Sequence, residues 1–340
     1  MKDGKYNIAV VGATGAVGIK MLEVIEKRKF PVGEITLLAS ENSAGKKIRF
    51  RKKLLQVRTL NQDSFRNIDI ALFSAGAGIS RDYAGTAVNS GAVVIDNSSY
   101  YRNDPDVPLV VPEINPEDIF KHKGIISNPN CTTAIMLTAL YPVYRTAGIK
   151  KIIVSTYQSV SGAGMRGVSE LEDQVKAISL GLKPDVSKFP HKIAYNLIPQ
   201  IDTFTADGYT KEEKKMLNET RKILHDGKIK VSSTCVRVPV RTAHSMAVTF
   251  TTGKYIPVDE VRRLLSVSEG IRVLDDPEKL LYPMPVNSEG NYDCFAGRIR
   301  KDIALRNGIS MWVCGDQLLK GAALNAVQIA EKLIANLRTA

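Results

Sequence analysis

The chain has 340 residues, long enough for two domains, and its 44% of apolar and 24% of charged residues are typical of a globular rather than a disordered protein. A net charge of +12 suggests an anionic partner, but the densest basic segment, GKKIRFRKK (45–53), has one aromatic residue, which favours a solvated face or phosphorylated small molecules over nucleic acid. Four cysteines without a CxxC pair argue against disulfides and metal, and no run reaches the ~18 apolar residues of a membrane span, so we expect a soluble, cytoplasmic protein.

The first third of the chain alternates strand and helix patterns. Apolar strands are predicted at 6–12, 34–40, 68–75 and 92–99, with helices at 16–29 and within 79–91. Continuous apolar strands between helices are typical of a buried parallel sheet. We therefore predict an α/β fold that begins with a Rossmann-like dinucleotide-binding domain at 1–130.

The pattern changes after residue 130. A helix is expected from 131 to 148, a strand from 149 to 162, a helix ending near Gly181, and an irregular proline-rich segment before the charged helix 212–224. The stretch 228–253 reads as paired strands, so 131–317 is predicted to be an α+β domain. An amphipathic helix at about 318–340 is expected to pack back on the first domain.

A glycine loop, GATGAVG (12–18), lies between the first strand and the first helix. In this context Gly12 permits a sharp turn, Gly15 lets backbone amides approach a pyrophosphate, and Gly18 permits close helix packing. The helix N-terminus adds free N–H groups for the anion. The loop predicts a dinucleotide site.

The end of the second predicted strand bears on the choice between NAD and NADP. Hydroxyl and amide side chains at Ser40, Asn42 and Ser43, followed by the lysine pair 46–47, suit a ribose 2′-phosphate, whereas Glu41 opposes it. NADP is therefore predicted as the cofactor.

Cys131 lies in the turn SNPNCTT, where a helix begins after Pro129. A helix N-terminus stabilises a thiolate and lowers the thiol pKa from its usual ~8.5, which indicates a nucleophile. Of the four histidines, His244 is the candidate partner, because it follows Arg237 and Arg241 on what reads as an alternating strand that exposes both arginines. Arginine there could clamp a carboxylate.

Six motifs in this order carry a resemblance over essentially the whole chain: GATGAVG, SNPNCTT, TYQSVSGAG, EEKKMLNET, CVRVPVRTAHS and GAALNAVQIAE. The chain resembles the bacterial type of aspartate-β-semialdehyde dehydrogenase. The resemblance implies NADPH-dependent, reversible reduction of L-aspartyl-4-phosphate to L-aspartate 4-semialdehyde and phosphate, on the route to lysine, diaminopimelate, threonine, methionine and isoleucine. It also implies that the second domain is catalytic and forms the interface of a homodimer or homotetramer.

The same resemblance assigns roles to individual residues. Cys131 would accept the acyl group and His244 would be the general acid/base. The substrate residues implied are Gln158 for orientation, Asn130 for polarising the carbonyl, Arg237 for the α-carboxylate, Glu212 for the amino group, and Arg102 with Lys215 for phosphate. The cofactor residues expected are Gly12, Thr14, Gly15, Ala16, Val17, Ser40, Asn42, Ser43, Ser161, Gly162 and Gln317.

The chain departs from the family pattern at two positions, and three alternative functions stay open. The family often has Arg-Ser where this chain has Asn42-Ser43, which weakens the case for strict NADP use, while Gln317 is a mild change. A reductase of N-acetylglutamyl phosphate would carry glycine in place of Asn130. A non-catalytic NADP-binding sensor or a basic nucleic-acid-binding protein would leave the combination of Cys131, Gln158, Arg237 and His244 unexplained.

Overall fold

The computed structural model describes residues 4–337, which form two compact units. The first unit runs to Asn130 and resumes at Ala322, and the second runs from Cys131 to Gly321. Among the described residues, no helix is both long and apolar enough to cross a bilayer.

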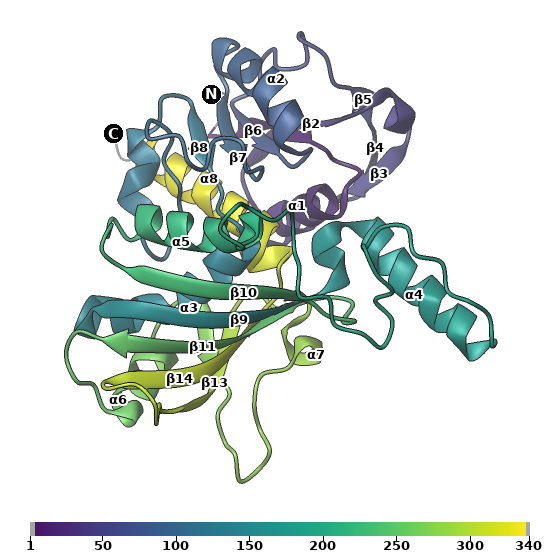
Figure 1. Cartoon of the computed structure of the whole chain (residues 1–340). Helices are drawn as coiled ribbons and strands as arrows, with labels where there is room; N and C mark the ends of the chain where they lie inside the picture. Colours follow the sequence, from purple (N-terminus) through teal and green to yellow (C-terminus); the bar gives the residue numbers. More distant parts are fainter. Residues whose placement is uncertain (1–3, 338–340) are drawn as a thin grey trace. The chain divides into compact units, whose positions relative to one another are not determined.

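The first unit contains a six-stranded sheet with the order β5-β2-β1-β6-β7-β8, in which every pairing is parallel (Figure 1). Its strands are β1 Tyr6–Val11, β2 Val32–Ala39, β5 Arg58–Thr59, β6 Ile70–Phe73, β7 Val93–Asp96 and β8 Ile125–Ser127. Its helices are α1 Ala16–Lys27, α2 Ala77–Asn89 and α8 Leu324–Leu337, with 3-10 turns at Glu41–Ser43 and Pro116–Lys121. A separate antiparallel hairpin, β3 Lys47–Phe50 and β4 Lys53–Gln56, carries the basic segment. The predicted doubly wound sheet is confirmed.

The apolar strands form the core of this unit, as their sequences predict. One cluster of buried residues joins β1, β6 and β7 to α2, with Phe65 and Phe73 stacked 5.8 Å apart. Strands that are buried on both faces explain why almost every position in β1 and β6 is apolar.

The C-terminal helix packs on the first unit. Arg28 of α1 makes a bidentate 2.7 Å ion pair with Glu331 of α8, and Asn325 Nδ2 donates to the Val110 carbonyl. The sequence predicted one helix over 318–340, but a π-helical turn, Leu319–Ala323, precedes α8. Residues 338–340 of that prediction lie outside the described part of the chain.

The second unit is built on a mixed sheet with the order β10-β9-β11-β14-β13-β12 (Figure 1). Its strands are β9 Ile149–Gln158, β10 Lys230–Arg237, β11 His244–Thr252, β12 Ile271–Val273, β13 Cys294–Lys301 and β14 Gly308–Gly315. Its helices are α3 Cys131–Ala147, α4 Met165–Ser179, α5 Lys211–Ile223, α6 Val258–Ser266 and α7 Pro285–Ser288, with a 3-10 turn at Val160–Ala163. The predicted α+β class is confirmed, and α3, α5 and α6 pack against the sheet.

Two expectations for 228–253 are wrong. The strands β10 and β11 do not pair with each other, because β9 lies between them and pairs with both. The alternation also does not expose both arginines: Arg237 ends β10 and is only 6% exposed, whereas Arg241 lies in the exposed connection to β11. Pro239 interrupts the run, since proline has no N–H for a ladder and is rarely found inside a central strand.

Candidate active site

The glycine loop borders a pocket in the first unit. Gly12 adopts φ +85°, where a side chain is strained, and an added Cβ would lie 2.8 Å from the Ser74 carbonyl oxygen. A Cβ on Gly18 would lie 2.3 Å from the Gly12 carbonyl oxygen, so α1 approaches the loop as closely as only glycine permits. Gly15 is the N-cap of α1, which leaves the first N–H groups of that helix for a ligand.

The pocket itself has a volume of about 540 Å³. Predicted residues on its wall are Gly12, Thr14, Gly15 and Ser40. Ala16 and Val17 begin α1, while Asn42 and Ser43 lie in the turn Glu41–Ser43, where the Ser43 hydroxyl is 3.4 Å from that of Thr14. Sequence reasoning missed the other side of the pocket, formed by Thr59, Leu60, Ser74, Ala75, Ile79 and Tyr83. These residues end or follow β5, follow β6, or lie in α2, so their position depends on strand order.

Arg102 is also held in the first unit. Its Nε donates to the Asn128 carbonyl at 2.9 Å and its Nη2 to the Asn97 carbonyl at 2.7 Å. The guanidinium is buried, and these two backbone acceptors fix its plane. Asn130, also buried, is the last residue of this unit in the chain before the nucleophile candidate.

Cys131 is the first residue of α3 in the second unit, and it is the partly exposed member of four free cysteines. The π-helical turn approaches it closely, since a Cβ on Gly321 would lie 2.6 Å from the Cys131 Cβ. The other three cysteines are buried, and burial raises the pKa of Cys235 to about 12. Partial exposure distinguishes Cys131 from the other three thiols, and its reactivity stays a prediction.

His244 begins β11 and is completely buried. Its Nδ1 lies 3.2 Å from the Ser159 backbone nitrogen and 3.1 Å from the Ser159 hydroxyl. Burial, and then the positive charge of Arg237, lower the pKa of His244 well below its usual value, so the ring is neutral.

The predicted cofactor residues of the second unit lie beside this histidine. Gln317 Nε2 donates to the Ser161 hydroxyl at 2.6 Å, and Gln317 Oε1 accepts from the Ala243 amide at 2.8 Å. A Cβ on Gly162 would lie 3.0 Å from His244 Cε1. These residues and the imidazole therefore share one site.

Arg237 connects the histidine to the cysteine. Its Nη1 donates to the Ser159 carbonyl at 2.7 Å, and its guanidinium lies 5.8 Å from the Phe189 ring centroid. Burial lowers the pKa of Arg237, while the charges of Glu212 and then Cys131 act in the opposite direction.

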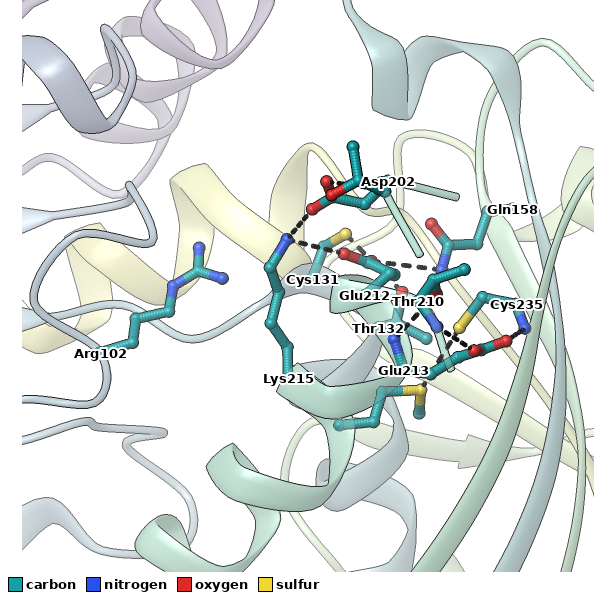
Figure 2. A network of polar contacts seen from close by, with 12 residues as sticks. Arg102, Cys131, Thr132, Gln158, Asp202, Thr210, Glu212, Glu213, Lys215 and Cys235 are labelled. Atoms are coloured by element: carbon teal, nitrogen blue, oxygen red, sulfur yellow. Dashed lines mark hydrogen bonds and ion pairs between the residues drawn. The ribbon is translucent and has the colours of Figure 1, made fainter. Parts of the chain in front are cut away.

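Gln158, Glu212 and Lys215 form the polar part of the site (Figure 2). Gln158 Nε2 donates to Glu212 at 3.3 Å, and Lys215 Nζ bridges Glu212 at 3.1 Å and Asp202 at 2.8 Å. Burial acts to lower the pKa of Lys215, but its two carboxylate partners outweigh it and raise that pKa above the usual value. Asp202 was missed by sequence reasoning because it lies in the irregular segment, where no periodic pattern places a side chain.

The helix that carries Glu212 is anchored by a capping box. Thr210 accepts from the Glu213 amide, and Glu213 accepts from the Thr210 amide at 2.6 Å. Glu213 also accepts from the Cys235 amide at 2.9 Å, which ties α5 to β10. The second unit thus brings together Cys131, Gln158, Ser161, Gly162, Glu212, Lys215, Arg237, His244 and Gln317.

Family models agree with this division of the chain. Residues 7–122 match the semialdehyde dehydrogenase NAD binding domain, and residues 140–320 match the semialdehyde dehydrogenase dimerisation domain. Fold, pocket and matches define an oxidoreductase that binds a nicotinamide dinucleotide. The aspartate-semialdehyde dehydrogenase of Aquifex aeolicus is 55% identical over 333 residues, 97% of this chain and 98% of that protein. The chain belongs to the aspartate-semialdehyde dehydrogenase family.

Solved structures agree at the level of the fold. Aspartate semialdehyde dehydrogenase II of Vibrio cholerae, in complex with ASA, superposes with a TM-score of 0.95 at 47% identity, covering 97% of this chain and 98% of that one. The Candida albicans aspartate semialdehyde dehydrogenase with NADP gives a TM-score of 0.76 at 26% identity, covering 97% and 98%.

Proposed function

We propose that this chain reduces L-aspartyl-4-phosphate to L-aspartate 4-semialdehyde and phosphate, with NADPH, through an acyl group on Cys131. One observation carries the proposal. The partly exposed thiol of Cys131 lies at the start of α3, in the same unit as the buried Arg237 and His244, and Arg237 interacts with both Cys131 and His244. Membership of the family supports L-aspartyl-4-phosphate as the substrate. The alternative function, reduction of N-acetylglutamyl phosphate, is not favoured.

In the proposed first step, Cys131 Sγ attacks the acyl carbon, forms a thioester and expels phosphate. The start of α3 favours the thiolate, and Lys215 and Arg102 are proposed to stabilise the departing anion. NADPH, when bound, would supply the hydride that reduces the thioester. Asn130 and His244 are proposed to contact the carbonyl oxygen, and collapse of the thiohemiacetal then releases the aldehyde.

The remaining groups of the substrate match the charges of the second unit. Arg237 would bind the α-carboxylate, Glu212 the amino group, and Gln158 would orient the chain between them. This assignment is supported by the burial of Arg237 and by the hydrogen bond that already joins Gln158 to Glu212. Oppositely charged partners at fixed positions select one orientation of an amino acid.

We propose NADP as the cofactor that is used. The glycine loop fits a dinucleotide because it lines the pocket and leaves the start of α1 without a side-chain cap, so its N–H groups can bind a pyrophosphate. The hydroxyl and amide side chains of Ser40, Asn42 and Ser43 favour binding of the ribose 2′-phosphate of NADP, whereas the carboxylate of Glu41 opposes it. The Candida albicans relative with NADP supports the preference. The ratio of kcat/KM with NADPH and NADH tests it, and a ratio near one would refute the preference.

We propose a homodimer or homotetramer that assembles through the second unit. One face of its sheet carries exposed apolar side chains: Ile153 is 49% exposed, and Tyr157 and Trp312 lie on the same face with ring centroids 5.3 Å apart. The dimerisation-domain match covers this sheet. Sedimentation should show at least a dimer, and a monomer for the whole concentration range would refute the assignment.

A cytoplasmic location is part of the proposal. It is supported by four free cysteines, which persist in reducing compartments.

The direct test measures phosphate-dependent reduction of NADP⁺ by aspartate semialdehyde. Wild type should be active, and Cys131→Ala should lose turnover while Cys314→Ala, a buried thiol, should keep it. Substantial turnover by Cys131→Ala would refute covalent catalysis. If the enzyme turned over the N-acetylglutamyl substrate in preference to aspartate semialdehyde, the proposed substrate assignment would be refuted.

A further inference from the structure

The irregular segment between α4 and α5 contacts Arg237 at two points. Ile198 forms an isolated antiparallel bridge with Arg237, in which the Ile198 amide donates at 3.0 Å and the Arg237 amide donates at 2.8 Å. Phe189, earlier in the same segment, is buried and its ring centroid lies 5.8 Å from the guanidinium carbon. We call residues 185–198 the strap, because they contact both the main chain and the side chain of Arg237.

Few other groups fix the Arg237 side chain. Within residues 4–337 its guanidinium donates one hydrogen bond, to the Ser159 carbonyl at 2.7 Å, and forms no ion pair, although it is buried. A guanidinium has five N–H donors, so most of them remain for a ligand. An aromatic face attracts a cation, and more strongly where water is excluded. The Phe189 ring and the Ser159 carbonyl therefore set the orientation of the guanidinium together.

The first half of the strap is held by a carboxylate of α4. Glu170 is buried, and its Oε2 accepts from the Ser187 amide at 3.2 Å, from the Ser187 hydroxyl at 3.0 Å and from the Lys188 amide. Its Oε1 accepts from the Phe189 amide at 3.5 Å. Three consecutive amides of the strap thus converge on one carboxylate, and the last of them belongs to the residue whose ring lies against Arg237.

Gln174, one turn further along α4, holds the second half of the strap. Its Oε1 accepts from the Ile193 and Ala194 amides at 2.9 and 3.0 Å, and its Nε2 donates to the Asp185 carbonyl at 2.8 Å. The same Nε2 donates to Glu170 at 3.0 Å, so the two side chains form one network. The helix itself packs against the 3-10 turn that follows β9 (Figure 1).

Apolar packing completes the attachment. One cluster of buried side chains joins Val168 and Leu171 of α4 to Phe189 and Ile193 of the strap. A Cβ on Gly167 would lie 3.0 Å from Phe189 Cζ, so the ring packs directly against the helix. Close packing of this kind leaves a side chain little freedom to move, so the Phe189 ring has a fixed position.

We propose that the strap positions Arg237 for the α-carboxylate of the substrate, with Phe189 as the positioning residue and Glu170 as its anchor. The inference rests on the proposed function, in which Arg237 binds that carboxylate. A guanidinium that is already oriented binds a carboxylate more tightly, because less freedom is lost on binding. The α-carboxylate takes no part in hydride transfer, so the strap should govern substrate binding more than the chemical step.

Phe189→Leu tests the positioning role. Leucine keeps an apolar side chain in the cluster but removes the aromatic face, so KM for aspartate semialdehyde should rise roughly 3–30-fold. The values of kcat and of KM for phosphate and NADP⁺ should stay within about threefold of wild type, since only binding at Arg237 is weakened. A wild-type KM for aspartate semialdehyde, or equal rises in all three KM values, would overturn the positioning role.

Val261→Ala is the control for a loss of stability alone. Val261 is buried in α6, which packs against α3, β12 and β13, so its truncation should lower the melting temperature without changing any KM. If Val261→Ala raised KM for aspartate semialdehyde as much as Phe189→Leu, the effect would be one of general destabilisation and the positioning role would be overturned.

Hydrogen–deuterium exchange, measured by mass spectrometry, tests the anchor without substrate. In Glu170→Ala the amides of residues 187–189 should exchange roughly tenfold faster or more, because each loses a charged acceptor. Glu170→Gln keeps one acceptor oxygen and should recover part of the protection, and Glu172→Ala, exposed on the same helix, should match wild type. Wild-type exchange in Glu170→Ala would overturn the anchor. Absence of turnover of aspartate semialdehyde by wild type would instead refute the proposed function, and the exchange result needs no turnover.

Discussion

Replacing Gly321 with alanine should displace the nucleophile. The new Cβ would lie 2.6 Å from the Cβ and 3.1 Å from the Cα of Cys131, whereas non-bonded carbons normally approach to about 3.5–4.0 Å. The π-helical turn and the start of α3 must therefore separate by roughly 1 Å. A displacement of this size at a reacting atom can lower the rate by about 10²-fold, so kcat should fall by that factor.

The assay is phosphate-dependent NADP⁺ reduction, with the rate of Cys131 alkylation by iodoacetamide as a second measure. Gly227→Ala is the matched control in the same unit, because a Cβ there meets nothing within 4 Å, and it should behave as wild type. Circular dichroism and the melting temperature verify that both variants are folded. A folded Gly321→Ala enzyme with the kcat of wild type would refute the claim that this contact positions the sulfur.

Three further outcomes are expected. Gly18→Ala should destabilise the protein by about 1–3 kcal/mol, measured by thermal unfolding, and weaken NADPH binding, measured by fluorescence titration. Gly85→Ala, which has open space around it, should change neither property. Arg237→Lys should raise KM for aspartate semialdehyde roughly 10–100-fold, since lysine lacks the planar fork, while the exposed Arg241→Lys should not; equal effects would contradict the assignment. Below pH ~6.5 His244 is protonated in the unfolded chain but not in the folded chain. As the pH falls below that value, His244 should therefore lower the free energy of unfolding by about 1.4 kcal/mol per pH unit. Above pH ~6.5 it should make no contribution. Urea unfolding of wild type and His244→Gln should show that difference in slope, and parallel slopes would refute a buried neutral ring.

The sequence was most informative where local pattern and long-range structure agree. The strands β1, β6 and β7 are mostly apolar because both of their faces are buried, so periodicity and glycine context were sufficient to predict the doubly wound sheet. Cys131 was also recognisable, since its turn and the following helix are consecutive in sequence.

Contacts between distant segments could not be predicted in the same way. The insertion of β9 between β10 and β11 joins residues about 80 to 100 positions apart, and no local pattern encodes it, although Pro239 signalled that the run was not one continuous hairpin. The same reason explains why Asp202 and Ser159 were missed as partners of Lys215 and His244. Their importance comes from the residues they meet, and their own sequence neighbourhoods give no sign of it.

The pairing of charges in the second unit bears on how a substrate would enter it. Glu212 and Asp202 share Lys215, and the buried Arg237 guanidinium donates to the Ser159 carbonyl and interacts with the charge of Glu212, so these charges have opposite partners within the protein. An isolated buried charge would be strongly destabilising. In the proposed assignment an amino acid phosphate brings an ammonium, a carboxylate and a phosphate group, so its amino group would join Lys215 at Glu212, and its phosphate would replace Asp202 at Lys215. Asp202 lies on the more exposed side of this bridge, with its side chain 33% exposed against 7% for Glu212, so phosphate should displace Asp202 and leave Glu212 in place.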